Sequence, residues 1–181
     1  NAYVCFCPRE RMAGQRRKGV GCEHRETDVS ENFALWQNML AGRYKEGEAV
    51  LRIKTDLDSK NPAVRDWPAM RIVDKPNHPF SKKHVWPLYN FASAIDDYLE
   101  NVTHIFRGQE HSTNETKQRF LYQHMKWEYP SVITLGRFSL SDTVLSKSAI
   151  REGIEKGAYS GWDDLRLGTL RSLRRRGFQP E

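Results

Sequence analysis

The apolar positions along the chain switch between helical and strand spacing, which predicts an α/β protein. Helices are expected where apolar side chains recur every three or four positions, over residues 28–40, 89–101 and 112–129. Ser30 is the expected N-cap of the first helix, and Pro130 is expected to end the third. Strands are expected in short apolar or alternating runs, at residues 3–7, 49–57, 66–75, 105–106 and 132–135.

Two segments lack such a pattern and are expected to be loops. Residues 9–21 are basic and carry three glycines, and residues 75–87 hold three prolines and three lysines. The second of these loops marks an expected crossing between domains.

The composition fits a folded, basic protein. A length of 181 residues suffices for one substantial domain with an appendage, and 38% hydrophobic residues with five tryptophans argue against disorder. The net charge of +6 suits a polyanionic partner, although ordinary soluble proteins reach similar values. No apolar run approaches the roughly 20 residues needed to cross a bilayer, so a cytoplasmic protein without a membrane partner is expected. The chain opens on Asn1 inside an expected strand, which indicates a piece of a longer protein.

Cysteine and histidine occur in two short pairs near the start of the chain. Cys5 and Cys7 are expected on the same side of one strand, and Cys22 and His24 follow in the order Cys-x-Cys-x14-Cys-x-His. Four protein ligands of this kind form closed, structural zinc sites. The spacing therefore predicts a structural Zn²⁺, while three thiols and an imidazole without any connection remain the alternative.

A polar tip from Arg107 to His111 follows the expected strand at residues 105–106. If that strand lies in a parallel sheet, the tip is at its carboxyl end, where open α/β sheets bind their ligands. A single arginine at this position can equally be a surface cation, and a tyrosine at a helix start, such as Tyr89, usually serves packing.

The joint pattern is more specific. The run YNFASAIDD followed by HIFRGQEH resembles the catalytic region of glutamyl- and glutaminyl-tRNA synthetases, most of all the archaeal type of the glutamyl branch. The resemblance implies that Tyr89 and Arg107 line the amino-acid pocket, with Glu110 as a further candidate for its wall. Glutaminyl enzymes carry a small neutral residue at the arginine position. A guanidinium pairs bidentately with a carboxylate, so Arg107 favours glutamate over glutamine.

A second motif follows the last expected strand. Residues 144–148, VLSKS, resemble the KMSKS loop of class I synthetases, with the first two positions changed as in archaeal members. The resemblance implies that Lys147 stabilises the departing pyrophosphate and that Leu145 and Ser146 lie against ATP, a substrate that carries Mg²⁺. It also assigns Arg137 and Phe138 to the adenosine.

The C-terminal part resembles the block that follows this loop in glutaminyl and archaeal glutamyl enzymes, through GWDDLR and LRRRG. Arg174, Arg175 and Arg176 are candidates for contact with tRNA phosphates, and a solvated helix end is the alternative. A cysteine and histidine zinc site also occurs in some members of the family, in the region that holds the tRNA acceptor end.

The resemblance implies the second half of a Rossmann-type parallel sheet with an inserted zinc-bearing module and a C-terminal helical segment. The expected divisions are residues 1–75 for the acceptor-binding insertion, 76–135 for the catalytic half-domain, and 136–181 for the loop and the stem-contact region. The implied reaction joins glutamate to a tRNA specific for glutamate, or also to one specific for glutamine, in a monomeric enzyme. No His-x-Gly-His signature occurs in the sequence, so the chain alone is expected to be inactive. The alternatives are a glutaminyl-tRNA synthetase and a non-catalytic, zinc-containing tRNA-binding paralogue.

Overall fold

The structure is a computed structural model that describes residues 1–136 and 140–179. These residues form two compact units, Asn1–Leu135 and Gly136–Glu181. Within the described ranges, no helix combines the length and the apolar character that crossing a membrane requires.

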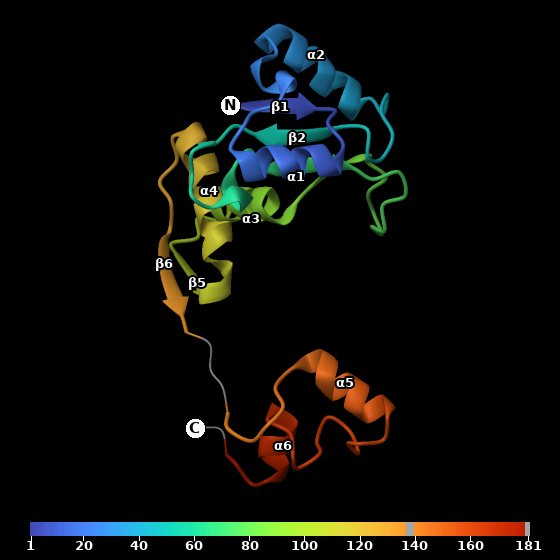
Figure 1. The fold of residues 1–181 in the computed structure, drawn as a ribbon. Coiled ribbons are helices and arrows are strands. Elements are labelled where there is room, and N and C mark those ends of the chain that lie inside the picture. Colours follow the sequence, from blue (N-terminus) through green and yellow to red (C-terminus); the bar gives the residue numbers. More distant parts are fainter. Residues whose placement is uncertain (137–139, 180–181) are drawn as a thin grey trace. The chain divides into compact units, whose positions relative to one another are not determined.

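The first unit is built on an antiparallel sheet of four strands in the order β1-β2-β3-β4 (Figure 1). The strands are β1 (Ala2–Cys5), β2 (Val50–Ile53), β3 (Pro68–Ile72) and β4 (Val85–Pro87). Tyr3 lies opposite Arg52, and Cys5 lies opposite Val50. Strand β4 corrects the prediction of a loop over residues 75–87, because the end of that segment pairs with β3 through a contact that its prolines did not indicate.

Helix α1 (Arg9–Lys18) corrects the prediction of a loop over residues 9–21. None of its side chains is buried, so it carries no apolar stripe that a sequence pattern could detect. Most of its residues nevertheless have high helix propensity, and three basic side chains in the last turn are favourable to the helix dipole. Gly19 ends the helix in the left-handed conformation with φ of 69°.

Helix α2 (Val29–Leu40) lies within the expected range of residues 28–40, but its N-cap is two residues earlier than expected. The cap is Asp28, whose carboxylate accepts a hydrogen bond of 2.8 Å from the Ser30 amide, so Ser30 lies within the first turn. Two short 3-10 helices, η1 (Glu23–Glu26) and η2 (Pro62–Val64), complete the connections of this part.

Helices α3 (Tyr89–Leu99) and α4 (Ser112–Met125) lie beside the antiparallel sheet, as Figure 1 shows. Their buried side chains Ala94, Leu121 and Tyr122 share one core with Ile53, Trp67 and Ala69 of the sheet region. Helix α4 ends at Met125 rather than at Pro130, since Lys126 turns into the left-handed conformation and Trp127 donates to the Tyr122 carbonyl.

Strands β5 (His104–Gly108) and β6 (Ser131–Leu135) pair in parallel, with α4 and the 3-10 helix η3 (Gln109–His111) between them. This arrangement confirms the α/β prediction with a parallel sheet. Strands of a parallel sheet are usually buried, but Phe106 is 65% exposed and Ile133 is 42% exposed. The reason is that, among the described residues, β5 and β6 pair only with each other.

The second unit holds helices α5 (Lys147–Glu155) and α6 (Leu170–Arg175). Ile150, Leu167 and Ser172 are buried in it, and a single bridge joins Val144 to Leu167. Asp164 organises the turn between the helices, because its carboxylate accepts hydrogen bonds from the Ser160 amide and from the Arg166 side chain.

Candidate functional site

The side chains of Cys5, Cys7, Cys22 and His24 converge, and their ligand atoms all lie within 4.8 Å of one another. The Sγ atoms of Cys5 and Cys22 are 3.7 Å apart, and the Cys7 Sγ is 3.7 Å from the His24 Nδ1. In a tetrahedral site with Zn–S bonds of about 2.3 Å, the sulfur atoms are about 3.8 Å apart. The residues therefore fit a zinc ion in donor type, number and spacing.

Two local structures bring these ligands together. Strand β1 ends at Cys5, so Cys7 lies just beyond the strand and not on it as predicted. Cys22 caps η1, which carries His24 in its first turn. The three cysteines are buried, and burial raises the pKa of the Cys7 thiol to about 12. Because a metal binds the thiolate form, loading this cluster must release protons.

Arg52 and Asp66 connect the cluster to the sheet. The fully buried Asp66 carboxylate accepts from the Tyr3 hydroxyl at 2.8 Å and from Arg25 Nε at 2.9 Å. Arg52 Nε donates to the Asp66 carbonyl at 2.8 Å, and its Nη1 is 3.7 Å from the sulfur atoms of both Cys5 and Cys22. The sequence pattern gave no indication of this network, because its members lie on separate elements.

Arg107 lies near the carboxyl end of β5 and is half-buried. Its Nη2 donates to Gln118 Oε1 at 3.0 Å and to the Tyr129 hydroxyl at 3.2 Å. Gln118 in turn donates to the Ser93 hydroxyl at 2.7 Å, and that hydroxyl donates to the Tyr89 carbonyl. A chain of hydrogen bonds therefore joins Arg107 to the first turn of α3.

The partners of Arg107 leave its charge available. Among the described residues, no carboxylate lies within ion-pair distance of this guanidinium, and both acceptors of Nη2 are neutral. Burial raises the pKa of Asp97 above its usual value, and the charge of Arg107 acts in the opposite direction. A guanidinium that is fixed by neutral groups can bind an anion.

The other two predicted amino-acid residues lie on the surface. Tyr89 is 67% exposed at the start of α3, and Glu110 is exposed within η3. In the described part of the chain, neither side chain forms a hydrogen bond or an ion pair with Arg107. Glu110 folds back over Gly108, where an added Cβ would lie 2.6 Å from the carboxylate.

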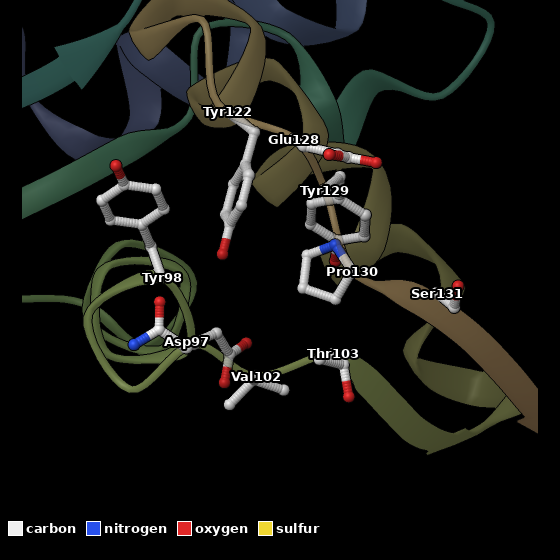
Figure 2. Close-up of a pocket in the computed structure, with 10 residues that line it drawn as sticks. Asp97, Tyr98, Val102, Thr103, Tyr122, Glu128, Tyr129, Pro130 and Ser131 are labelled. Carbon is white, nitrogen blue, oxygen red and sulfur yellow. The ribbon is translucent and has the colours of Figure 1, made fainter.

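A pocket of about 410 Å³ lies at the opposite, amino ends of the two parallel strands (Figure 2). Asp97 and Glu128 line it, no basic residue does, and Figure 2 shows the Tyr122 hydroxyl pointing into it. Burial raises the pKa of Tyr122 to about 12. Because of its acidic lining, the pocket does not suit an anionic substrate. Arg107 does not line it, so the binding of glutamate expected at Arg107 is not assigned to this pocket.

In the second unit, Lys147 is the first residue of α5 and is exposed. Ser146 caps this helix by accepting from the Ala149 amide at 3.4 Å, and Leu145 is 45% exposed. Lys147 and Arg171 line a cavity of about 470 Å³, so two cations face one space beside a helix N-terminus. Arg137 and Phe138, predicted to hold adenosine, lie outside the described residues.

The three arginines predicted to contact tRNA are exposed but differ in their partners. Arg174 and Arg175 line a cavity of about 580 Å³ together with Asp163, which pairs with Arg175 at 3.3 Å. Arg176 instead donates to the Leu167 carbonyl at 3.4 Å.

The sequence matches the family of class I tRNA synthetases (E and Q), catalytic domain, over residues 1–181. It is 62% identical to a glutamate–tRNA ligase from Pyrococcus horikoshii and 60% identical to one from Thermococcus kodakarensis. Each similarity covers 99% of this chain and 32% of the relative, so the chain spans about a third of the length of these proteins. A crystal structure of a glutamate tRNA ligase from Elizabethkingia meningosepticum is 23% identical over 86% of this chain and 33% of that chain. The TM-score between the two structures is 0.46.

Proposed function

Since the chain belongs to the class I tRNA synthetases of the E and Q type, catalytic domain, we propose that it is part of a glutamate–tRNA ligase. The whole protein would activate glutamate with ATP to glutamyl-adenylate and then transfer the glutamyl group to the terminal ribose of a tRNA. The tRNA would be specific for glutamate. The proposed setting is a monomeric enzyme of the cytoplasm.

The charge of Arg107 and its neutral hydrogen-bond partners are the observation that favours glutamate as the substrate. Its guanidinium is fixed by the neutral acceptors Gln118 and Tyr129 and keeps its charge for a ligand. A carboxylate can accept hydrogen bonds from the remaining donors of this guanidinium and balance its charge, whereas the neutral amide of glutamine cannot balance the charge. Tyr89 and Glu110 would form further parts of the amino-acid pocket.

Lys147 would act on ATP. Attack of the glutamate carboxylate on the α-phosphate breaks the bond to pyrophosphate, and negative charge builds on that leaving group. The Lys147 ammonium at the exposed start of α5 is suited to stabilise this charge, with the Ser146 hydroxyl and Leu145 beside it. Mg²⁺ would accompany ATP, as in other reactions at phosphates.

Cys5, Cys7, Cys22 and His24 would hold a zinc ion in a closed site. Four protein ligands leave no position for water, so the metal would stabilise the fold of this part of the chain and take no part in the reaction. The proposed division into an acceptor-binding module at residues 1–75, a catalytic half-domain at residues 76–135 and a stem-contact region at residues 136–181 follows the sequence. Arg174, Arg175 and Arg176 would contact tRNA phosphates.

Substitution of Lys147 tests whether the parent is an enzyme or a tRNA-binding paralogue. In the full-length protein, Lys147→Ala should reduce tRNA-dependent pyrophosphate exchange with glutamate by at least about 100-fold and leave the Kd for tRNA within about twofold. The matched control is Lys156→Ala, because Lys156 ends the same helix and forms an exposed ion pair with Glu152. A variant that exchanges normally but loses tRNA affinity would support the binding paralogue instead.

A further inference from the structure

A second cavity, of about 500 Å³, lies against the cysteine cluster in the first unit. Cys5 and Cys7 form part of its wall, and neither Arg107 nor Lys147 lines it. Its charged lining residues are four arginines and one aspartate: Arg9, Arg16, Arg52, Arg71 and Asp66.

The one carboxylate of this lining is already neutralised. Asp66 is fully buried and forms an ion pair of 2.9 Å with Arg25, which does not line the cavity. The Asp66 carboxylate also accepts hydrogen bonds from the Tyr3 hydroxyl and the Thr55 amide. Asp66 therefore has little capacity left to balance the arginines of the cavity.

The four arginines have no carboxylate partner among the described residues. Burial lowers the pKa of Arg16 and of the half-buried Lys117. The charge of Arg52 lowers the pKa of Arg16 further, and the charge of Arg16 lowers that of Lys117 further. Like charges therefore gather at this place without compensation from the protein.

The metal cluster accounts for only one of these charges. Zn²⁺ with three thiolates and a neutral imidazole carries a net charge of about −1, which the Arg52 contacts to Cys5 and Cys22 can balance. Arg9, Arg16 and Arg71 remain. Such a surplus in a partly enclosed cavity attracts an anion from solution.

The geometry suits one kind of anion in particular. Arg52 is 2% exposed, and the Asp66 carbonyl and two sulfur atoms fix its orientation, so it forms a rigid part of the cavity wall. Exposed Arg9 and Arg71 can close around a ligand from the solvent side. Planar guanidinium groups of this kind recognise tetrahedral phosphate oxygens in pairs.

We propose that this arginine-lined cavity binds a phosphate group, supplied either by the backbone of an RNA or by a free phosphate compound such as pyrophosphate. The site extends the proposed function, but its existence does not depend on which amino acid the parent protein activates. Arg52 is its buried positioning residue, held by the same sulfur atoms that would bind zinc.

Two arginines that do not contact the cysteines serve as the test positions. In the full-length protein, Arg16→Gln and Arg71→Gln each remove one charge from the cavity, and Arg43→Gln removes one charge from an exposed position that does not line it. A tRNA transcript is titrated over a range of salt concentrations, and sodium pyrophosphate is titrated by calorimetry. Thermal unfolding of each variant checks that the fold is kept.

If RNA supplies the phosphate, each cavity variant should bind the transcript about tenfold more weakly than the Arg43→Gln control. The slope of log K against log salt should fall by about 0.7 to 0.9 for each lost contact. If a free compound supplies it, the cavity variants should lose the heat of pyrophosphate binding and keep RNA affinity. Cavity variants that match the control in both titrations would overturn the proposal. Glutamate-dependent exchange of the wild type, measured in parallel, tests the ligase separately from this site.

Discussion

Replacement of Asp66 by asparagine is the most informative test of the network beside the cysteine cluster. The Asp66 Oδ1 accepts from the Thr55 amide at 2.9 Å, and its Oδ2 accepts from Tyr3 and Arg25. Its backbone has φ of 37°, a conformation that asparagine tolerates better than most residues. Asp66→Asn therefore keeps the backbone and the Thr55 contact while it removes the charge.

The expected loss follows from the contacts of Oδ2. An amide NH₂ group at that position would face the Nε–H of Arg25. Two hydrogen-bond donors would then point at each other where the native protein has a buried ion pair. Removal of one partner of a buried ion pair costs about 3–5 kcal/mol, and the 23% exposure of the Arg25 side chain favours the lower end. We expect a loss of about 3 kcal/mol. With a urea m-value of about 2 kcal/mol per molar, the unfolding midpoint would fall by about 1.5 M.

Urea unfolding followed by tryptophan fluorescence measures this loss. Asp58→Asn is the matched control, because Asp58 is exposed and its side chain has no hydrogen bond within the described residues, and it should change the free energy of unfolding by less than about 0.5 kcal/mol. If Asp66→Asn shifted the midpoint no further than this control, the inferred role of Asp66 would be refuted.

Three further predictions concern other parts of the molecule. Hydrogen bonds from the Arg166 side chain, and then from backbone amides, hold the pKa of Asp164 well below its usual range. Its stabilisation is therefore complete above about pH 4 and is lost as the pH falls through the folded-state pKa, and Asp164→Asn should flatten this dependence in acid unfolding experiments. Cys22→Ser should weaken zinc binding by more than about 100-fold in a chelator competition, and an unchanged zinc affinity would contradict the proposed ligand set. Gln118→Glu places a carboxylate against Arg107, so the KM for glutamate should rise by about tenfold in pyrophosphate exchange, and an unchanged KM would argue against Arg107 as the glutamate ligand.

The elements that the sequence predicted correctly are those with buried, periodic side chains. Helices α3 and α4 present Ala94, Leu121 and Tyr122 to the core, and this spacing is visible in the sequence. Helix α1 has no buried residue and so had no pattern to detect. Strand β4 depends on its pairing with β3, which proline-rich local sequence does not indicate.

Residues of the candidate site were likewise predicted where a local pattern marks them and missed where only the fold brings them together. Cys5, Cys7, Cys22 and His24 could be grouped because each pair shares one local spacing, and the structure brings all four together. The hydrogen bonds of Arg107 to Gln118 and Tyr129 join separate elements and were missed. One signal was present in α4, where Gln118 precedes Leu121 and Tyr122 by three and four positions and therefore lies on their buried side.

The Arg52 network had no comparable signal. An arginine within an alternating strand reads as a solvent-facing residue, whereas Arg52 is almost completely buried. Its burial depends on the Asp66 carbonyl and on two sulfur atoms from distant parts of the chain. Only the folded arrangement identifies it, and with it the arginine-lined cavity.

Pyrophosphate exchange by the full-length protein is the most direct test of the proposed ligase. The exchange is measured in the presence of tRNA with glutamate and, in parallel, with glutamine. The state of Arg107 predicts exchange with glutamate and none above background with glutamine. Exchange with glutamine alone would contradict the role of Arg107, and exchange with neither amino acid would contradict the ligase itself.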